Sequence, residues 1–161
     1  MSYRLLAVFQ FAVLFLTVSP NAMATTRYVN GGSGSNANSC TSSSTACKTI
    51  GHAISLAASG DSIMVAAATY TENLTLAKNV KVIGSTTATI IDGGAKGIVI
   101  KISAGVSGTL QHLTIRNGLA LNGGGILNYG TLAIKSCIIT GNQTKSLGFG
   151  GRRLEPRNGE N

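Results

Sequence analysis

Short apolar runs separated by polar turns follow one another along the chain from Asp61 onward. Each run has three to eight residues, is rich in β-branched types and ends at Gly, Asn or Asp, a pattern typical of short strands joined by turns. The runs span residues 63–65, 74–76, 80–83, 89–91, 98–102, 110–115 and 132–139. Because no helical pattern interrupts them, alternating β-α units are excluded. The chain is predicted to be all-β, either an antiparallel sandwich or a β-solenoid.

An internal repeat decides between these two folds. The segments TIIDGG, LTIRNG and CIITGN align without gaps and start at residues 89, 113 and 137, which are 24 residues apart. A period of this size is typical of solenoids. Successive coils of a solenoid lie about 4.8 Å apart. We therefore expect Ile91, Ile115 and Ile139 to stack in one inward column, and Cys137 to be a buried thiol on the same face.

The residues between these inward positions are expected to face solvent. Asp92 and Arg116 fall one coil apart, where they would form a surface ion pair worth at most about 1 kcal/mol. The same alternation places Ile90, Thr114 and Ile138 outward, and it offers no reason for the two exposed isoleucines.

One stretch before the strands has a helical period. Residues 49–59 carry apolar side chains at three- and four-residue spacings, and Gly60 follows them. This pattern predicts a short amphipathic α-helix that ends at a left-handed glycine cap. His52 lies off the apolar side of this helix and is expected to face solvent.

Residues 1–24 have the features of a secretory signal peptide. The positive charge of Arg4 precedes an apolar run over residues 5–18 and the small-residue site Ala22-Met23-Ala24. The run is shorter than the ~20 apolar residues that a membrane-spanning helix needs, and no later segment is apolar enough to span. We therefore expect cleavage after Ala24 and a secreted chain without a transmembrane segment.

Composition and charge agree with a chain of strands and tight turns. Charged residues make up 11% of the chain, and glycine numbers 21. The net charge of +8 arises mainly because acids are scarce. The basic residues are spread singly from Arg27 to Lys145, with one cluster at the end of the chain. A nucleic-acid partner is therefore not expected.

Two of the three cysteines enclose a Ser/Thr-rich loop. Cys40 and Cys47 stand on either side of TSSSTA in a chain that is expected to be secreted, which favours a disulfide. Their spacing is poor for zinc and no histidine stands beside them in the sequence. Neither a metal nor a cofactor is expected.

Several segments together resemble a known family. The N-terminal block RYVNGGSGSNANSCTSSSTACKTIGHAI, the strand segments that follow it and GGGILNYGTLAIKSCIITGN resemble bacterial extracellular proteins with right-handed parallel β-helix repeats. These proteins share the pectin-lyase-like fold and include polymorphic-outer-membrane-protein-like and autotransporter-like adhesins. The resemblance covers about residues 27–144 and implies a right-handed, single-stranded parallel β-helix. In this family a helix caps the N-terminal end of the solenoid, as expected here for residues 49–59.

The resemblance also defines the expected organisation of the chain. A signal peptide (1–24) precedes a polar segment with a disulfide loop (25–48), then the capping helix and coils (49–144), and an irregular tail (145–161). Family members continue for more coils, so the chain is expected to be a truncated or frame-shifted member. An unprotected strand edge at its end would make it marginally stable or prone to aggregation.

No catalytic residue is expected from the sequence. Calcium-dependent lyases need several carboxylates and hydrolases need a pair, whereas the coils contain only Asp61, expected in a turn, Glu72, expected in a loop, and Asp92. His112 is expected to be an exposed strand residue beside Arg116, without an orienting carboxylate.

Two function classes follow from this. The expected function is a secreted or surface-exposed, outer-membrane-associated structural or adhesin-like protein whose partners are extracellular glycans or another protein. The alternative is a polysaccharide lyase or glycoside hydrolase that acts on acidic polysaccharide, because the pectin-lyase-like fold includes such enzymes.

Overall fold

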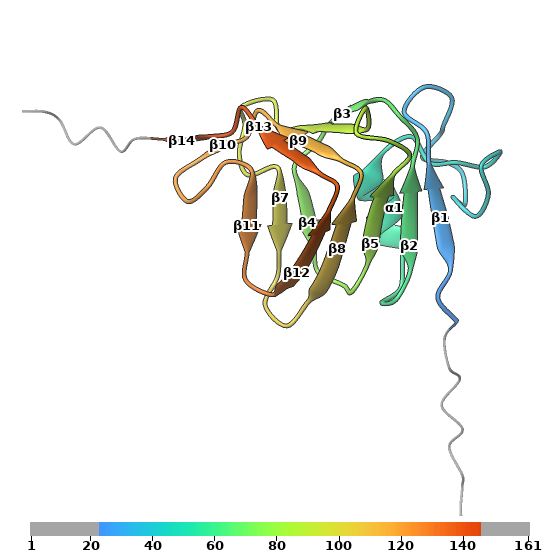
Figure 1. The fold of residues 1–161 in the computed structure, drawn as a ribbon. Coiled ribbons are helices and arrows are strands. Elements are labelled where there is room, and N and C mark those ends of the chain that lie inside the picture. The colour runs from blue at the N-terminus through green and yellow to red at the C-terminus, as the bar shows by residue number, and fades with distance from the viewer. Residues whose placement is uncertain (1–22, 146–161) are drawn as a thin grey trace, which may run out of the picture.

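Parallel strands wind the chain into a β-solenoid of about three turns (Figure 1). The computed structural model describes residues 23–145. Most of the predicted signal peptide (1–24) and of the tail (145–161) therefore lie outside the described residues. Every strand ladder is parallel, which excludes the antiparallel sandwich.

The strands form three main sheets, one for each side of the solenoid, and a short fourth ladder. Sheet A contains β1 (Thr26–Val29), β2 (Ser62–Val65), β5 (Lys81–Gly84), β8 (Ser107–Gln111) and β12 (Thr131–Lys135). Sheet B contains β3 (Thr69–Thr71), β6 (Ile90–Asp92), β9 (Thr114–Arg116) and β13 (Ile138–Thr140). Sheet C contains β4 (Leu74–Leu76), β7 (Ile100–Ile102) and β11 (Ile126–Asn128), and β10 (Leu119–Ala120) pairs with β14 (Gln143–Thr144).

The register of β6, β9 and β13 in sheet B follows the 24-residue spacing, whereas β3 pairs with β6 at a spacing of 21, Thr69 with Ile90. Ile91 pairs with Ile115, and Ile115 pairs with Ile139. The first two are fully buried, but Ile139 is 49% exposed. The expectation that all three would be interior fails for Ile139, because none of the described residues forms a further coil over the last one. For the same reason Cys137 is only partly buried and packs at the margin of the core.

Strict alternation fails near the corners of the solenoid. Thr114 was expected outward but is buried, and its hydroxyl donates to the carbonyl of Thr87 at 2.7 Å. Ile90 is partly buried, while Ile138 is 48% exposed as predicted. The chain bends between β8 and β9, so residues on both sides of the bend can turn inward.

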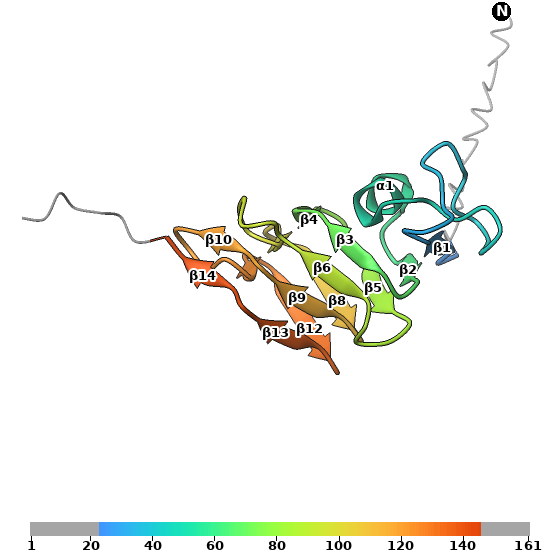
Figure 2. The same cartoon turned by 90° about the horizontal axis from the view of Figure 1, so that it is seen from above.

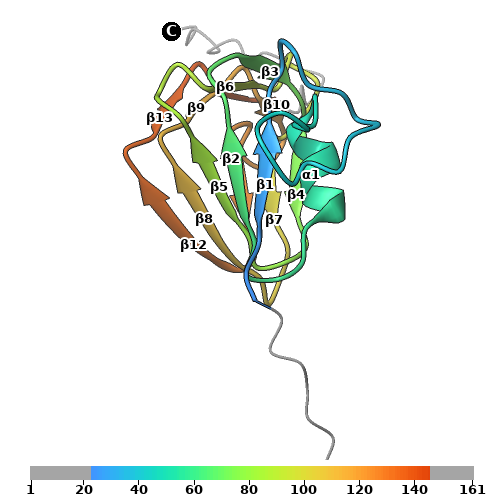
Figure 3. The same cartoon turned by 90° about the vertical axis from the view of Figure 1, so that its right-hand side faces the viewer.

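The helix α1 (Ile50–Leu56) lies at the N-terminal end of the solenoid, beside β1, β2 and β4 (Figure 3). It is shorter than the predicted 49–59. Thr49 is its N-cap and accepts a hydrogen bond from the N–H of His52. The C-cap is Ala57 in an extended conformation. Gly60 has φ +100° but lies beyond this cap, so the predicted glycine cap is wrong.

Figure 2 shows the strands of sheet B stacked one after another, from the α1 end to the C-terminal end. The interior holds aliphatic side chains from all three main sheets, and the largest fully buried ones are isoleucine, leucine and valine. Of the helices in the described part of the chain, none is long and apolar enough to cross a membrane.

Candidate functional site

Glu72 binds the start of α1. The residue lies between β3 and β4, and its two carboxylate oxygens accept from the backbone N–H groups of Ile50 and Gly51 at 2.9 and 2.8 Å. The first N–H groups of a helix have no partner within the helix. This carboxylate supplies one from the neighbouring turn, so Glu72 is more than the loop residue expected from the sequence.

Asp61 joins the first strand to the exit of the helix. The residue is 2% exposed, and it accepts from the backbone N–H groups of Thr25 and Ala58 at 2.8 and 2.9 Å. Arg27 lies 3.8 Å from its Oδ2 atom. Burial acts to raise the pKa of Asp61, but the two backbone hydrogen bonds and the nearby guanidinium outweigh it, and the pKa is lowered. Asp61, which the sequence predicted to be a turn residue, is thus a buried side chain that links the segment before β1 to the segment after α1.

Asp92 pairs with Arg116 as predicted, with 2.9 Å between Arg116 Nε and Asp92 Oδ2. This carboxylate was expected from the sequence to face solvent, but it is buried. It also accepts from the N–H of Gly94 at 2.9 Å and from the side-chain amide of Asn117 at 2.8 Å. The hydrogen bond from Gly94 is the main reason that its pKa is lowered. Burial opposes this effect, and Arg116 and Asn117 add to it.

These three are the acids of the described chain, and they share no partner. Each carboxylate is occupied by at least two donors that hold the fold. Such a group has little freedom to coordinate calcium or to take a proton from a substrate.

His112 occupies the corner between β8 and β9. Its φ of 52° is in the left-handed region, and Ser136 has φ 49° at the next corner, between β12 and β13. The expectation of a residue on a strand face is therefore wrong. The backbone N–H of His112 donates to the carbonyl of Lys135 at 3.1 Å, which ties the two corners together. The role of this residue is to turn the chain.

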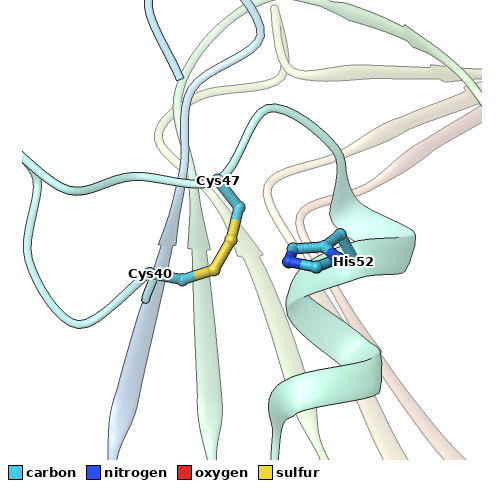
Figure 4. Close-up of side chains that lie close together, drawn as sticks. All are labelled: Cys40, Cys47 and His52. Carbon is cyan, nitrogen blue, oxygen red and sulfur yellow. A yellow bond between two sulfur atoms is a disulfide. The ribbon is translucent and has the colours of Figure 1, made fainter. Parts of the chain in front are cut away.

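Cys40 and Cys47 are joined by a disulfide beside α1 (Figure 4). Both cysteines are fully buried. His52 points toward the disulfide, and its ring nitrogen lies within 4.8 Å of both sulfur atoms. The sequence predicted that His52 faces solvent, away from the cysteines. The fold brings it beside the disulfide, and its position in the sequence did not indicate this contact. A disulfide offers no thiolate to a metal, so this cluster acts as a covalent clasp.

The disulfide loop borders a pocket on the outer face of sheet A. The pocket has a volume of about 230 Å³, and its apolar walls include Tyr28, Met64 and Ala46. Asn30, Ser43 and Ser85 supply polar atoms. Ligand sites for drug-sized molecules usually occupy about 300–1,000 Å³, so this pocket suits one sugar ring or one side chain.

Tyr28 and Met64 of this pocket also begin a column of outward, partly exposed residues that the sequence did not reveal. The sheet A register aligns the outward residues Tyr28, Met64, Ile83, Gln111 and Lys135 from one strand to the next. An aromatic and two aliphatic side chains therefore lead to a polar and a basic one. Alternation within each apolar run could have identified these residues as outward-facing. Which of them are neighbours depends on how the strands of sheet A pair, and the sequence does not show this.

Comparisons with family models, with curated proteins and with solved structures found no match to this chain.

Proposed function

We propose that the chain is a secreted or surface-exposed, non-enzymatic β-helix protein that binds an extracellular glycan or another protein through the outer face of sheet A. The observation that carries this proposal is the pocket at Tyr28 and Met64, two residues that also begin the outward column of the same sheet. Tyrosine combines a flat apolar ring with a polar hydroxyl, which suits it to binding surfaces.

The finer assignment rests on the sequence. The resemblance of residues 27–144 supports a right-handed helix of the pectin-lyase-like class and a bacterial, adhesin-like protein at the outer surface. The features of residues 1–24 support export. Expression with the native N-terminus in a bacterial host should give a mature chain that begins at Thr25. Recovery of an uncleaved chain from the cytoplasm would contradict export.

The absence of an acid pair among the described residues supports a binding role over catalysis. Asp61, Glu72 and Asp92 are each engaged by donors within the fold, whereas glycoside hydrolysis requires two carboxylates at one bond. The lining residues of the Tyr28 pocket also include no carboxylate.

A glycan array, followed by titration of the best ligand, tests the proposal. Tyr28→Ala should weaken binding at least tenfold, because it removes the ring from the pocket. Tyr129→Ala is the matched control, since Tyr129 is exposed beside Lys101 and is not part of the pocket lining. Equal loss in both variants, or no binding to any glycan or surface protein, would contradict the proposed site.

The enzymatic alternative is tested on the same preparation. Acidic and neutral polysaccharides are incubated with the protein and Ca²⁺, and unsaturated products and reducing ends are measured. We expect neither to accumulate. Turnover that Tyr28→Ala leaves intact would replace the binding proposal with a lyase or hydrolase.

A further inference from the structure

The last strand of sheet A is an exposed edge without the usual protection. β12 pairs on one side with β8, and no described strand lies on its other side. Natural edge strands are usually protected by charges, proline or bulges. The segment TLAIK contains one charge, at Lys135, and no proline. Ile134 within it is 45% exposed.

The opposite end of the same sheet is closed. β1 is the first strand, and the disulfide loop covers its outer edge: Tyr28 N–H donates to the Cys40 carbonyl, and Cys47 N–H donates to the Tyr28 carbonyl, at 2.8 and 2.9 Å. α1 packs across this end of the solenoid as well (Figure 3). The β12 edge of one copy therefore finds no free β1 edge on another copy, and head-to-tail stacking is blocked.

The backbone groups that β12 leaves free follow from its hydrogen bonds. Thr131 N–H donates to the Val106 carbonyl at 2.8 Å, and the Lys135 carbonyl accepts from His112 N–H at 3.1 Å. Residues 131, 133 and 135 thus direct their backbone groups toward β8. Because alternate residues of a strand bond to opposite sides, Leu132 and Ile134 direct their N–H and C=O groups to the open edge.

This edge is complementary to itself. Antiparallel pairing about a twofold axis at Ala133 places Leu132 opposite Ile134 of the second copy, and the two can exchange both backbone hydrogen bonds. Their side chains lie on the same, inward side of the sheet, because they occupy alternate positions of one strand. Lys135 lies opposite Thr131 of the second copy, so two like charges do not face each other.

We propose that two copies of this chain associate through β12 into a closed, twofold-symmetric dimer in which sheet A continues from one solenoid into the other. An interface that uses the same surface on both copies closes at two and does not grow into a fibre. The pairing covers the open edge and buries the exposed part of Ile134. It does not involve the Tyr28 pocket, which lies at the β1 end of sheet A.

Light scattering coupled to size-exclusion chromatography of the full, exported chain tests the stoichiometry. The wild-type protein should have twice the mass of one chain at micromolar concentration. Ile134→Lys should give a monomer, because it places a charge at the centre of the paired edge. Leu56→Lys is the matched control, since Leu56 is similarly exposed, at 41% against 45%, but lies on α1 at the opposite end of the solenoid. This control should remain a dimer.

A cross-link locates the twofold axis independently of these charge changes. In the proposed register Ala133 faces itself in a non-hydrogen-bonded pair, where the Cα atoms are about 4.5 Å apart, within disulfide range. Ala133→Cys, combined with Cys137→Ser, should form a reducible dimer under mild oxidation. Lys135→Cys in the same background should not, because two residues 135 lie more than about 13 Å apart, four residues along the strand.

Several results would overturn the proposal. They are a wild-type monomer at 100 μM (about a hundredfold above a micromolar Kd), assemblies larger than two, an Ile134→Lys dimer, or equal cross-linking of the two cysteine variants. A wild-type monomer would favour a different occupant of the β12 edge, such as residues 146–161 of the same chain.

Discussion

Replacing Asp92 with alanine removes one acceptor that three donors share. Gly94 N–H and the Asn117 amide donate to it at 2.9 and 2.8 Å, and Arg116 Nε lies at 2.9 Å. The two neutral donors would each lose a hydrogen bond to a charged group in a partly buried position, at a cost of about 1.5 kcal/mol each. The guanidinium is 39% exposed, so its share is at most about 1 kcal/mol. The expected loss is about 3–4 kcal/mol in the free energy of unfolding.

Equilibrium unfolding in urea measures this loss, and thermal unfolding should show a midpoint lower by about 10 °C for a domain of this size. Arg116→Ala is the control, because it removes only the exposed partner and should cost about 1 kcal/mol. The reasoning is refuted if Arg116→Ala destabilises the protein as much as Asp92→Ala, or if Asp92→Ala costs less than 1 kcal/mol.

The pH dependence of the same variant provides a second check. The Gly94 hydrogen bond, against the opposing effect of burial and with help from Arg116 and Asn117, lowers the pKa of Asp92 below its ordinary 3.8. The folded state therefore binds fewer protons than the unfolded state, and the stabilisation is complete above about pH 4 and is lost as the pH falls through the folded-state pKa. The gap between wild type and Asp92→Ala should narrow below pH 4. Asp61 titrates in both proteins, so it cancels in this difference.

Three further substitutions test local features of the fold. His112→Gly should stabilise the protein by about 1 kcal/mol, since it relieves a left-handed backbone conformation, and urea unfolding should show a higher midpoint. The double change Cys40→Ser and Cys47→Ser should remove about 2 kcal/mol by opening a short loop; unchanged stability on denaturant titration would contradict the role of a clasp. Gly118→Ala should cost more than about 3 kcal/mol, because a Cβ atom there overlaps a backbone carbonyl of the next segment. Gly97→Ala, whose Cβ atom would make only an ordinary van der Waals contact of 3.8 Å with Asn73 Nδ2, should be close to neutral in the same thermal assay.

The parallel solenoid could be predicted because the last three strands of sheet B repeat at one spacing. The Ile91, Ile115 and Ile139 positions are visible in the sequence, and the structure pairs them. Sheet A has no such regularity, because Ser62 pairs with Lys81 while Lys81 pairs with Thr109. Because the turns between these strands differ in length, the sequence does not show how the strands of sheet A pair. The outward column at the candidate site therefore could not be predicted.

The errors at single residues have a common physical cause. Sequence reasoning assigned Asp61, Glu72 and His52 from their neighbours in the chain. Their partners come instead from other segments: Thr25, the start of α1 and the disulfide loop, respectively. Polar contacts of this kind depend on which segments the solenoid brings together, and periodicity within a run carries no information about them.

The two ends of the solenoid differ in a way that bears on its stability. Each turn contacts only its neighbours, so the closed N-terminal end, with α1 and the disulfide loop, can stabilise only the turns next to it. The last turn has a partner on one side among the described residues, and it exposes Ile134, Ile138 and Ile139. An edge covered by a second copy would stabilise that turn by mass action, so the thermal midpoint should rise with protein concentration. An edge that leads to open-ended aggregation would instead give irreversible unfolding that worsens with concentration. The same melting experiment at several concentrations therefore separates a closed dimer from the marginal, aggregating monomer that the sequence predicts.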